Sequence, residues 1–107
     1  MLKQNSEFQQ VYRRGKSAHS TSLTLFYLPV LGEKKVGYTA SKKVGNAVIR
    51  NRSKRRLRAL FTELKNGLDD GLYVFVAKKG VYENSFESVK RDFNYVLKRM
   101  GITKSSD

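Results

Sequence analysis

The chain has 107 residues, of which 39% are hydrophobic, and its formal net charge is +13. This length fits one domain with a modest core, over residues 1–107. The chain has no cysteine, which excludes disulfides and thiolate metal sites, and its apolar runs are too short to cross a bilayer. Because no apolar signal segment opens the sequence, we expect a cytoplasmic protein.

The first predicted element is a short helix that begins at Asn5 or Ser6 and ends at Gly15. Ser6 and Gln9 have the spacing of a capping box. The apolar residues that share one face of this helix are Phe8, Val11 and Tyr12.

A strand is predicted at residues 22–30, because apolar side chains alternate between its two faces. One face carries Leu23, Leu25 and Tyr27, and the other carries Thr24, Phe26 and Leu28. Residues 32–34 predict a hairpin turn into a returning strand through Val36, Tyr38 and Ala40. We therefore expect two or three strands in this half of the chain.

The second half predicts a helix, a strand and a helix. After a loop at residues 41–46, a long helix runs from about Asn46 to Lys65. Residues 72–77 are a continuous apolar run that is typical of a strand buried on both faces. Asn84 or Ser85 caps the last helix, whose apolar set is Phe86, Val89, Phe93, Val96, Leu97 and Met100. The fold class is therefore α+β, a two-layer sandwich with helices against one sheet, and we expect residues 103–107 to be a disordered tail.

Positive charge is concentrated in residues 42–58, which hold eight of the 22 Lys and Arg residues and no acidic residue. On a helical wheel the apolar arc consists of Ile49, Ser53, Leu57, Leu60, Phe61 and Leu64. The opposite side carries Arg52, Lys54, Arg55 and Arg58, and the flanks carry Arg50 and Arg56. A folded surface with this charge indicates a nucleic-acid partner, because Arg binds phosphate with two hydrogen bonds and Lys with a point charge.

Asn51 and Asn46, which lie within the basic segment, can each be interpreted in two ways. Asn51 lies on the charged side, where it could contact a base edge or a 2′-hydroxyl or be an ordinary solvated residue. Lys42 and Lys43 precede the helix N-terminus, whose backbone N–H groups can hold a phosphate. Asn46 fits this site and fits an ordinary N-cap equally well.

The aromatic residues also have two readings. Phe8, Tyr12 and Phe26 could line a positive groove for single-stranded nucleic acid, or they could simply pack in the core. Periodicity places Phe61, Phe75 and Phe93 in the core.

No catalytic residue is predicted. His19 is the only histidine, and we expect it in a polar loop without an evident partner. Asp69 and Asp70 form an acidic pair in a turn, where turn chemistry or weak Mg²⁺ binding is expected. No phosphate-binding loop or nucleophile motif is present, and no carboxylate set suits two-metal cleavage.

The charged segment resembles the signature of a known family, the bacterial ribonuclease P protein component. The resemblance rests on the run Lys42-Lys43-Val44-Gly45-Asn46-Ala47-Val48, followed by Arg50-Asn51-Arg52, Lys54-Arg55 and Arg58. The first helix, with Phe8, Val11, Tyr12 and Gly15, and the last strand and helix also match, so nearly the whole chain is covered.

The resemblance implies a fold of order α-β-β-β-α-β-α with a left-handed β-α-β crossover, against the usual right-handed rule. It also implies an accessory subunit of a ribonucleoprotein endoribonuclease, in which a catalytic RNA uses Mg²⁺ to remove the 5′ leader of precursor tRNA. The implied partners are the catalytic RNA and precursor tRNA, with no membrane, no small-molecule substrate and no cofactor held tightly by the protein.

The implied contacts fall into two sets. The catalytic RNA would meet Lys42, Lys43, Asn46, Arg50, Asn51, Arg52, Lys54, Arg55 and Arg58. The leader would lie in a cleft lined by Phe8, Tyr12 and Phe26, with Tyr27 as the alternative to Phe26. Family members often carry a longer basic segment where this chain has only Met1-Leu2-Lys3, so the contacts of that segment are not carried over.

Two other functions remain open on the sequence alone. A structural RNA-binding protein of ribosomal type would have the same composition, but it would not need an aromatic cleft. A stand-alone nuclease would need a catalytic constellation, which the sequence lacks.

Overall fold

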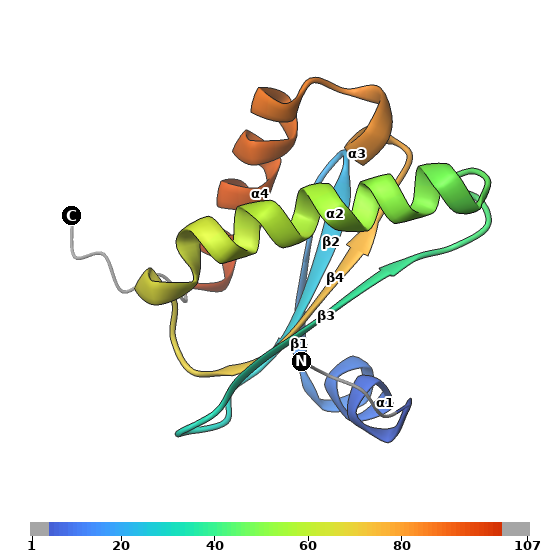
Figure 1. Ribbon diagram of the computed structural model, residues 1–107. Helices are drawn as coiled ribbons and strands as arrows, with labels where there is room; N and C mark the ends of the chain where they lie inside the picture. The colour runs from blue at the N-terminus through green and yellow to red at the C-terminus, as the bar shows by residue number, and fades with distance from the viewer. Residues whose placement is uncertain (1–4, 102–107) are drawn as a thin grey trace.

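The computed structural model describes residues 5–101, so Met1–Lys3 and the predicted tail at residues 103–107 lie outside the described residues. Nine elements follow one another along the chain (Figure 1). They are α1 (Asn5–Arg14), β1 (Lys16–His19), β2 (Leu23–Leu28), β3 (Lys34–Ala40), α2 (Ala47–Leu64), the 3₁₀ helix η1 (Lys65–Gly67), β4 (Gly71–Ala77), α3 (Gly80–Glu83) and α4 (Phe86–Met100). No helix in the described range is long and apolar enough to cross a membrane.

The four strands form one sheet in the order β1-β2-β4-β3. β2 is antiparallel to β1 and to β4, whereas β3 is parallel to β4. The predicted hairpin between β2 and β3 is therefore wrong, because β4 lies between these strands. Val74 of β4 is opposite Phe26 of β2 on one side and Gly37 of β3 on the other.

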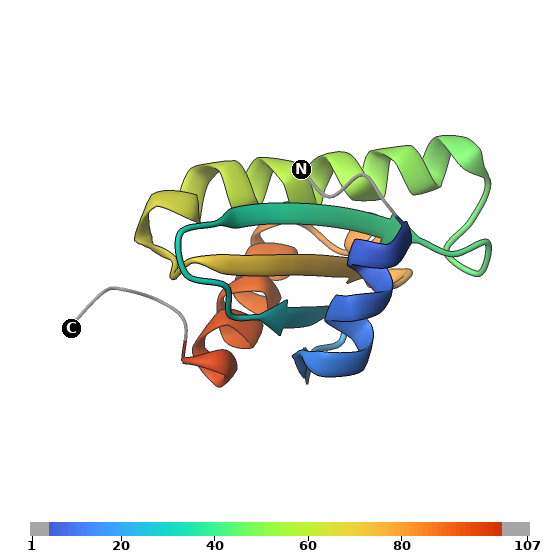
Figure 2. The same ribbon diagram turned by 90° about the horizontal axis from the view of Figure 1, so that it is seen from below.

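Helices cover both faces of this sheet. α2 and α4 pack on one face, where the main core contains Leu57 and Phe61 from α2 and Phe93 from α4. α1 crosses the strands near one end of the other face (Figure 2), where Val11 packs against Leu72 and Val74 in a smaller cluster. The side chains of β4 alternate between the two clusters, which confirms the prediction that this strand is buried on both faces.

The observed order agrees with α-β-β-β-α-β-α, with the short helix α3 added before α4. β3, α2 and β4 form the parallel β-α-β crossover, and its left-handedness stays a prediction. His19 ends β1 instead of lying in a loop, and its Nδ1 is 3.1 Å from the Thr24 hydroxyl of the neighbouring strand.

The helix ends are set by local hydrogen bonds. Ser85 caps α4 by accepting a hydrogen bond from the backbone N–H of Ser88, and Gly101 ends α4 with a left-handed φ of 67°. Both ends agree with the sequence. Ser6 lies inside α1, so it does not cap this helix.

Candidate nucleic-acid interface

The loop before α2 has a buried residue at its centre and two exposed lysines. Val44 is buried, and its N–H donates to the carbonyl of Ser41 at 3.0 Å. Gly45 has a φ of 153°, and a Cβ at this position would lie 2.9 Å from Cγ2 of Ile49, so only glycine fits. Lys42 and Lys43 are exposed. The loop therefore presents both ammonium groups beside the N-terminus of α2.

Asn46 is the N-cap of α2. Its Oδ1 accepts a hydrogen bond from the backbone N–H of Ile49 at 3.0 Å. The first turn of the helix holds no acidic residue, so α2 itself does not offset the positive end of its helix dipole. Of the two sequence readings of Asn46, the capping one is confirmed.

The inner face of α2 agrees with the helical wheel. Leu57, Leu60 and Phe61 are buried in the main core. Ser53 is also buried, and its hydroxyl donates to the carbonyl of Ile49 at 2.9 Å, which explains how a polar residue is accommodated on this face. This apolar anchor fixes the orientation of the opposite face.

The outer face of α2 forms a basic ridge, which we define as Arg52, Lys54, Arg55 and Arg58. The three arginines are exposed, as is the neighbouring Asn51, and Lys54 is half-buried. The ion pairs found among residues 5–101 involve Lys35 and Lys90, and none of them includes a residue of the ridge. The ridge therefore carries positive charge that the described protein does not neutralise.

Arg56, next to this ridge, has a structural role. Its Nη1 donates to the carbonyls of Val81 and Asn84 at 2.7 and 2.8 Å, which ties α2 to the end of α3. Sequence reasoning placed Arg56 on a flank without a partner, because nothing in the sequence had indicated α3. On the other flank, Nε of Arg50 is buried without a hydrogen-bond partner among the described residues.

A hollow of about 670 Å³ lies between α2 and α3. Arg52 and Arg55 of the ridge line it together with Arg56, Tyr82 and Glu83. Arginine side chains of α2 thus line this hollow as well as the exposed ridge.

Three aromatic side chains come together on the opposite face of the sheet. Tyr12 lies between Phe8 and Phe26, with ring centroids 6.5 and 4.9 Å away, and it meets Phe26 edge to face at 81°. All three are half-buried and rest on the cluster around Val11 and Val74. We call these three residues the aromatic surface.

Tyr27 does not belong to the aromatic surface. It is buried in the main core on the α2 face, and its hydroxyl donates to the carbonyl of Asp70 at 2.6 Å. The strand alternation therefore selects Phe26 over Tyr27.

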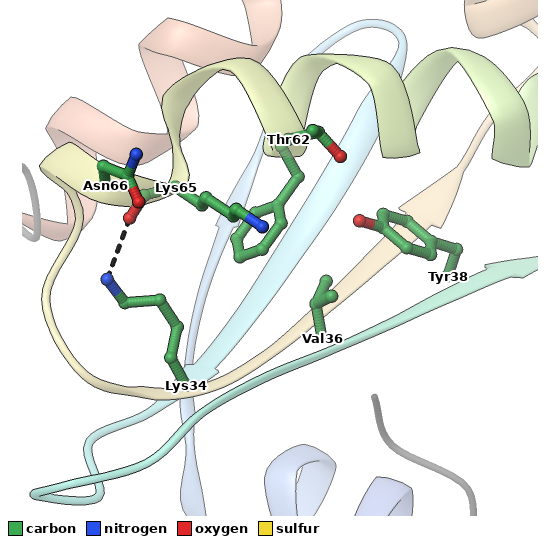
Figure 3. Close-up of a pocket in the computed structure, with 7 residues that line it drawn as sticks. Lys34, Val36, Tyr38, Thr62, Lys65 and Asn66 are labelled. Carbon is green, nitrogen blue, oxygen red and sulfur yellow. Dashed lines mark hydrogen bonds between the residues drawn. The ribbon is translucent and has the colours of Figure 1, made fainter.

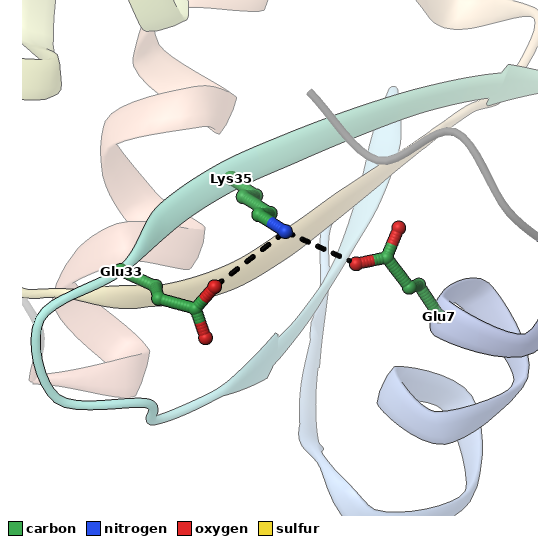
Figure 4. A network of polar contacts seen from close by, with 3 residues as sticks. All are labelled: Glu7, Glu33 and Lys35. Atoms are coloured by element: carbon green, nitrogen blue, oxygen red, sulfur yellow. Dashed lines mark hydrogen bonds and ion pairs between the residues drawn. The ribbon is translucent and has the colours of Figure 1, made fainter.

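Two contacts fix α1 beside the sheet. Lys35 of β3 lies between two carboxylates, 3.4 Å from Glu7 of α1 and 3.5 Å from Glu33 (Figure 4). The hydrogen bond to Glu7, reinforced by the charges of both carboxylates, raises the pKa of Lys35. At the other end of α1, a Cβ on Gly15 would lie 2.6 Å from the carbonyl oxygens of Val11 and Tyr27, so the helix end packs directly on β2.

The acidic pair serves the turn before β4. The carbonyls of Asp69 and Asp70 accept hydrogen bonds from the Tyr73 and Tyr27 hydroxyls, and the Asp70 carboxylate accepts one from the N–H of Gly32 at 3.1 Å. This agrees with the predicted turn role. Within residues 5–101, no group of three His, Cys, Asp or Glu side chains is placed to hold a metal ion.

Comparison with known proteins gives these surfaces a context. Residues 1–101 match the family model described as Ribonuclease P. Ribonuclease P protein components from Nitratiruptor sp. and Bacillus cereus strain Q1 are 43% and 39% identical to this chain. The alignments cover 92% and 96% of this chain, and 90% and 92% of the respective relatives.

Solved structures share the fold. The RNase P protein of Staphylococcus aureus superposes with a TM-score of 0.86 at 25% identity, covering 95% of each chain. The RNase P protein of Thermotoga maritima gives a TM-score of 0.80 at 24% identity, covering 92% of this chain and 94% of that one. These matches do not favour the alternative of a structural ribosomal-type protein. The chain therefore belongs to the ribonuclease P protein component family, the protein subunit of a ribonucleoprotein endonuclease that processes the 5′ end of tRNA.

Proposed function

We propose that the two surfaces divide the RNA between them. The basic ridge and the loop before α2 bind the catalytic RNA, and the aromatic surface holds the single-stranded 5′ leader of precursor tRNA. The observation that carries the proposal is the unneutralised charge of the ridge on a helix whose inner face is fixed in the core. The side chains of such a surface can exchange bound water for phosphate contacts without a change in the fold.

The catalytic RNA would be held mainly through its backbone. Exposed guanidinium groups form paired hydrogen bonds to phosphate, and lysines add point charges. The proposed contacts are Lys42, Lys43, Asn46, Arg50, Asn51, Arg52, Lys54, Arg55 and Arg58. Because Asn46 uses its Oδ1 as a cap, it would act mainly by ordering the helix N-terminus.

The leader would be held by its bases. Aromatic faces bind unpaired bases with little dependence on sequence, which suits a leader that differs from one precursor to another. Only the precursor has a leader, so contacts of Phe8, Tyr12 and Phe26 with it would favour precursor over mature tRNA. Product release would follow from the loss of these contacts after cleavage.

Catalysis belongs to the RNA in this proposal. Mg²⁺ would be held by the RNA, and the protein would help by offsetting phosphate repulsion where the ion binds. The protein would therefore matter most at low Mg²⁺, where fewer cations offset this repulsion.

The test is cleavage of precursor tRNA at low Mg²⁺ by catalytic RNA alone, protein alone and both together. We expect efficient leader removal only in the mixture. If the protein gave no stimulation of a folded RNA, the proposal would be rejected. Cleavage by the protein alone would show that it contains an active site.

A further inference from the structure

A hollow of about 420 Å³ lies between the edge strand β3 and the last turns of α2 (Figure 3). This volume is within the range of small-ligand sites, roughly 300–1,000 Å³. Val36 and Phe61 give it an apolar lining, and polar side chains surround that lining. It is separate from the aromatic surface, which lies on the other face of the sheet.

Tyr38 presents to this hollow a hydroxyl that has no partner among the described residues. Its ring is held by Phe75, stacked at a centroid distance of 6.0 Å, and by the guanidinium of Arg58, 5.4 Å from the ring centroid. The hydroxyl is directed into the hollow (Figure 3) and forms no hydrogen bond within residues 5–101, whereas the Tyr27 and Tyr73 hydroxyls donate to carbonyls. Burial raises the pKa of Tyr38 to about 12, so the group is a hydrogen-bond donor at neutral pH.

The rim of the hollow is positive. Lys34 donates to the carbonyl of Lys65 at 2.8 Å, which holds its ammonium group at the end of α2. The Lys65 side chain extends across the hollow, toward Tyr38 (Figure 3). Among residues 5–101, no carboxylate lines the hollow, and the neighbouring Glu33 and Glu63 pair with lysines outside it.

We propose that this hollow binds one unpaired nucleotide of the catalytic RNA. The base lies against Val36 and Phe61 and accepts a hydrogen bond from the Tyr38 hydroxyl, and the phosphate lies between Lys34 and Lys65. The site extends the basic ridge, because Arg58 belongs to the ridge and also packs on Tyr38. For that reason the occupant is the catalytic RNA and not the leader. This inference rests on the proposed function.

The first test measures the affinity of the full-length protein for the catalytic RNA. Tyr38→Phe removes only the hydroxyl, and we expect it to weaken binding by about 2- to 10-fold, the range of one hydrogen bond. Lys34→Gln with Lys65→Gln should weaken binding and lower the log–log salt slope by about 1, as expected for one lost phosphate contact. The matched control is Lys16→Gln with Lys98→Gln, which removes two exposed charges that do not line the hollow and should leave that contact intact.

The second test locates the nucleotide. A photoreactive benzophenone amino acid in place of the exposed Thr62, at the rim, is irradiated in the assembled holoenzyme with precursor tRNA bound. We expect crosslinks at one unpaired position of the catalytic RNA, and we expect Tyr38→Phe to reduce them. Crosslinks to the precursor leader, or to a protein partner, would overturn the assignment.

The outcomes separate this inference from the proposed function. If wild-type protein neither binds the catalytic RNA nor stimulates cleavage, the proposed function fails. If wild-type protein does both while the Tyr38 and lysine variants behave like the control pair, only the nucleotide site is rejected.

Discussion

Arg55 and Arg56 are adjacent in α2 but have different roles, because successive helical residues point in directions about 100° apart. Arg55 is exposed and forms no ion pair within residues 5–101, whereas Arg56 donates to the carbonyls at the end of α3. Loss of the first should affect RNA binding, and loss of the second should affect folding. Substitutions at these two neighbouring positions should therefore have different effects.

Arg52→Ala with Arg55→Ala should leave the free energy of unfolding nearly unchanged, because both side chains are exposed and point away from the core. RNA affinity should fall by at least tenfold, since two phosphate contacts are lost. Denaturant unfolding and filter binding check the two parts. A double variant that is unfolded at room temperature would mean that the outer face of α2 is wrongly assigned.

Arg56→Ala should destabilise the protein by about 1.5–3 kcal/mol, the range for hydrogen bonds to a charged group. The carbonyls of Val81 and Asn84 lose a donor, and α3 loses its tie to α2. The measurement is the urea midpoint, with Arg55→Ala as the matched control. Equal midpoints for the two variants would contradict the structural role.

Tyr38 should make stability fall at alkaline pH. Its pKa is raised by burial to about 12, whereas in the unfolded chain it has the ordinary value of about 10. Below pH 10 both states keep the proton and stability is complete. Between about pH 10 and 12 the unfolded state loses its proton first, so the folded state loses stability.

The check is the free energy of unfolding of wild type and Tyr38→Phe measured at pH 8 and at pH 11. The variant should match wild type at pH 8, because the hydroxyl has no partner among the described residues, and it should lose less stability at pH 11. Parallel losses in the two proteins would refute this account.

At the scale of elements, periodicity predicted α1, α2 and α4, but it missed the short helices η1 and α3 and failed at strand pairing. The apolar arcs of α2 and α4 and the caps at Asn46 and Ser85 are local properties that the sequence states directly. The neighbour of a strand is not a local property. A turn at residues 32–34 suggested a hairpin, yet β4 is apolar on both faces and therefore takes the inner position between β2 and β3.

The candidate site was predicted to a similar extent. The outward side of the ridge follows from helical spacing, and the structure confirms this placement. The meeting of Phe8, Tyr12 and Phe26 was implied by the family resemblance, whereas their spacing alone left core packing equally open, and the structure brings the three rings together. The roles of Arg56 and Tyr38 could not be predicted, because each depends on an element far away in the sequence. Arg56 needs the carbonyls of α3, and Tyr38 needs the end of α2 beside it.

α1 should carry the preference for precursor tRNA. Phe8→Ala removes one ring from the aromatic surface, and stacking contributes about 1–3 kcal/mol per base. Affinity for leader-bearing tRNA should therefore fall at least fivefold, while affinity for the catalytic RNA stays close to wild type. Tyr95→Ala removes a half-exposed ring on α4 and serves as the control. Equal losses for both RNAs would reject the assignment of the leader to this surface.

At the scale of the whole molecule, the net charge of +13 should make RNA binding strongly dependent on salt. Six phosphate contacts give a log–log slope of about −5, because each contact releases counterions. Affinity for the catalytic RNA measured at several KCl concentrations tests this number. An affinity that hardly changed with salt concentration would contradict electrostatic binding of the RNA by the ridge.

The position of β4 also has a consequence for the order of events during synthesis. β4 is the last strand to leave the ribosome, and it pairs with both β2 and β3. Until residues 71–77 emerge, the only strand pairing of the described sheet open to the nascent chain is β1 with β2, and β3 has no partner strand. α2, with its charges, is therefore finished before it has a sheet to pack on. Folding of this protein is therefore completed by its C-terminal third. A chain that ends before residue 71 lacks the strand that contributes to both hydrophobic clusters, and we expect it not to fold.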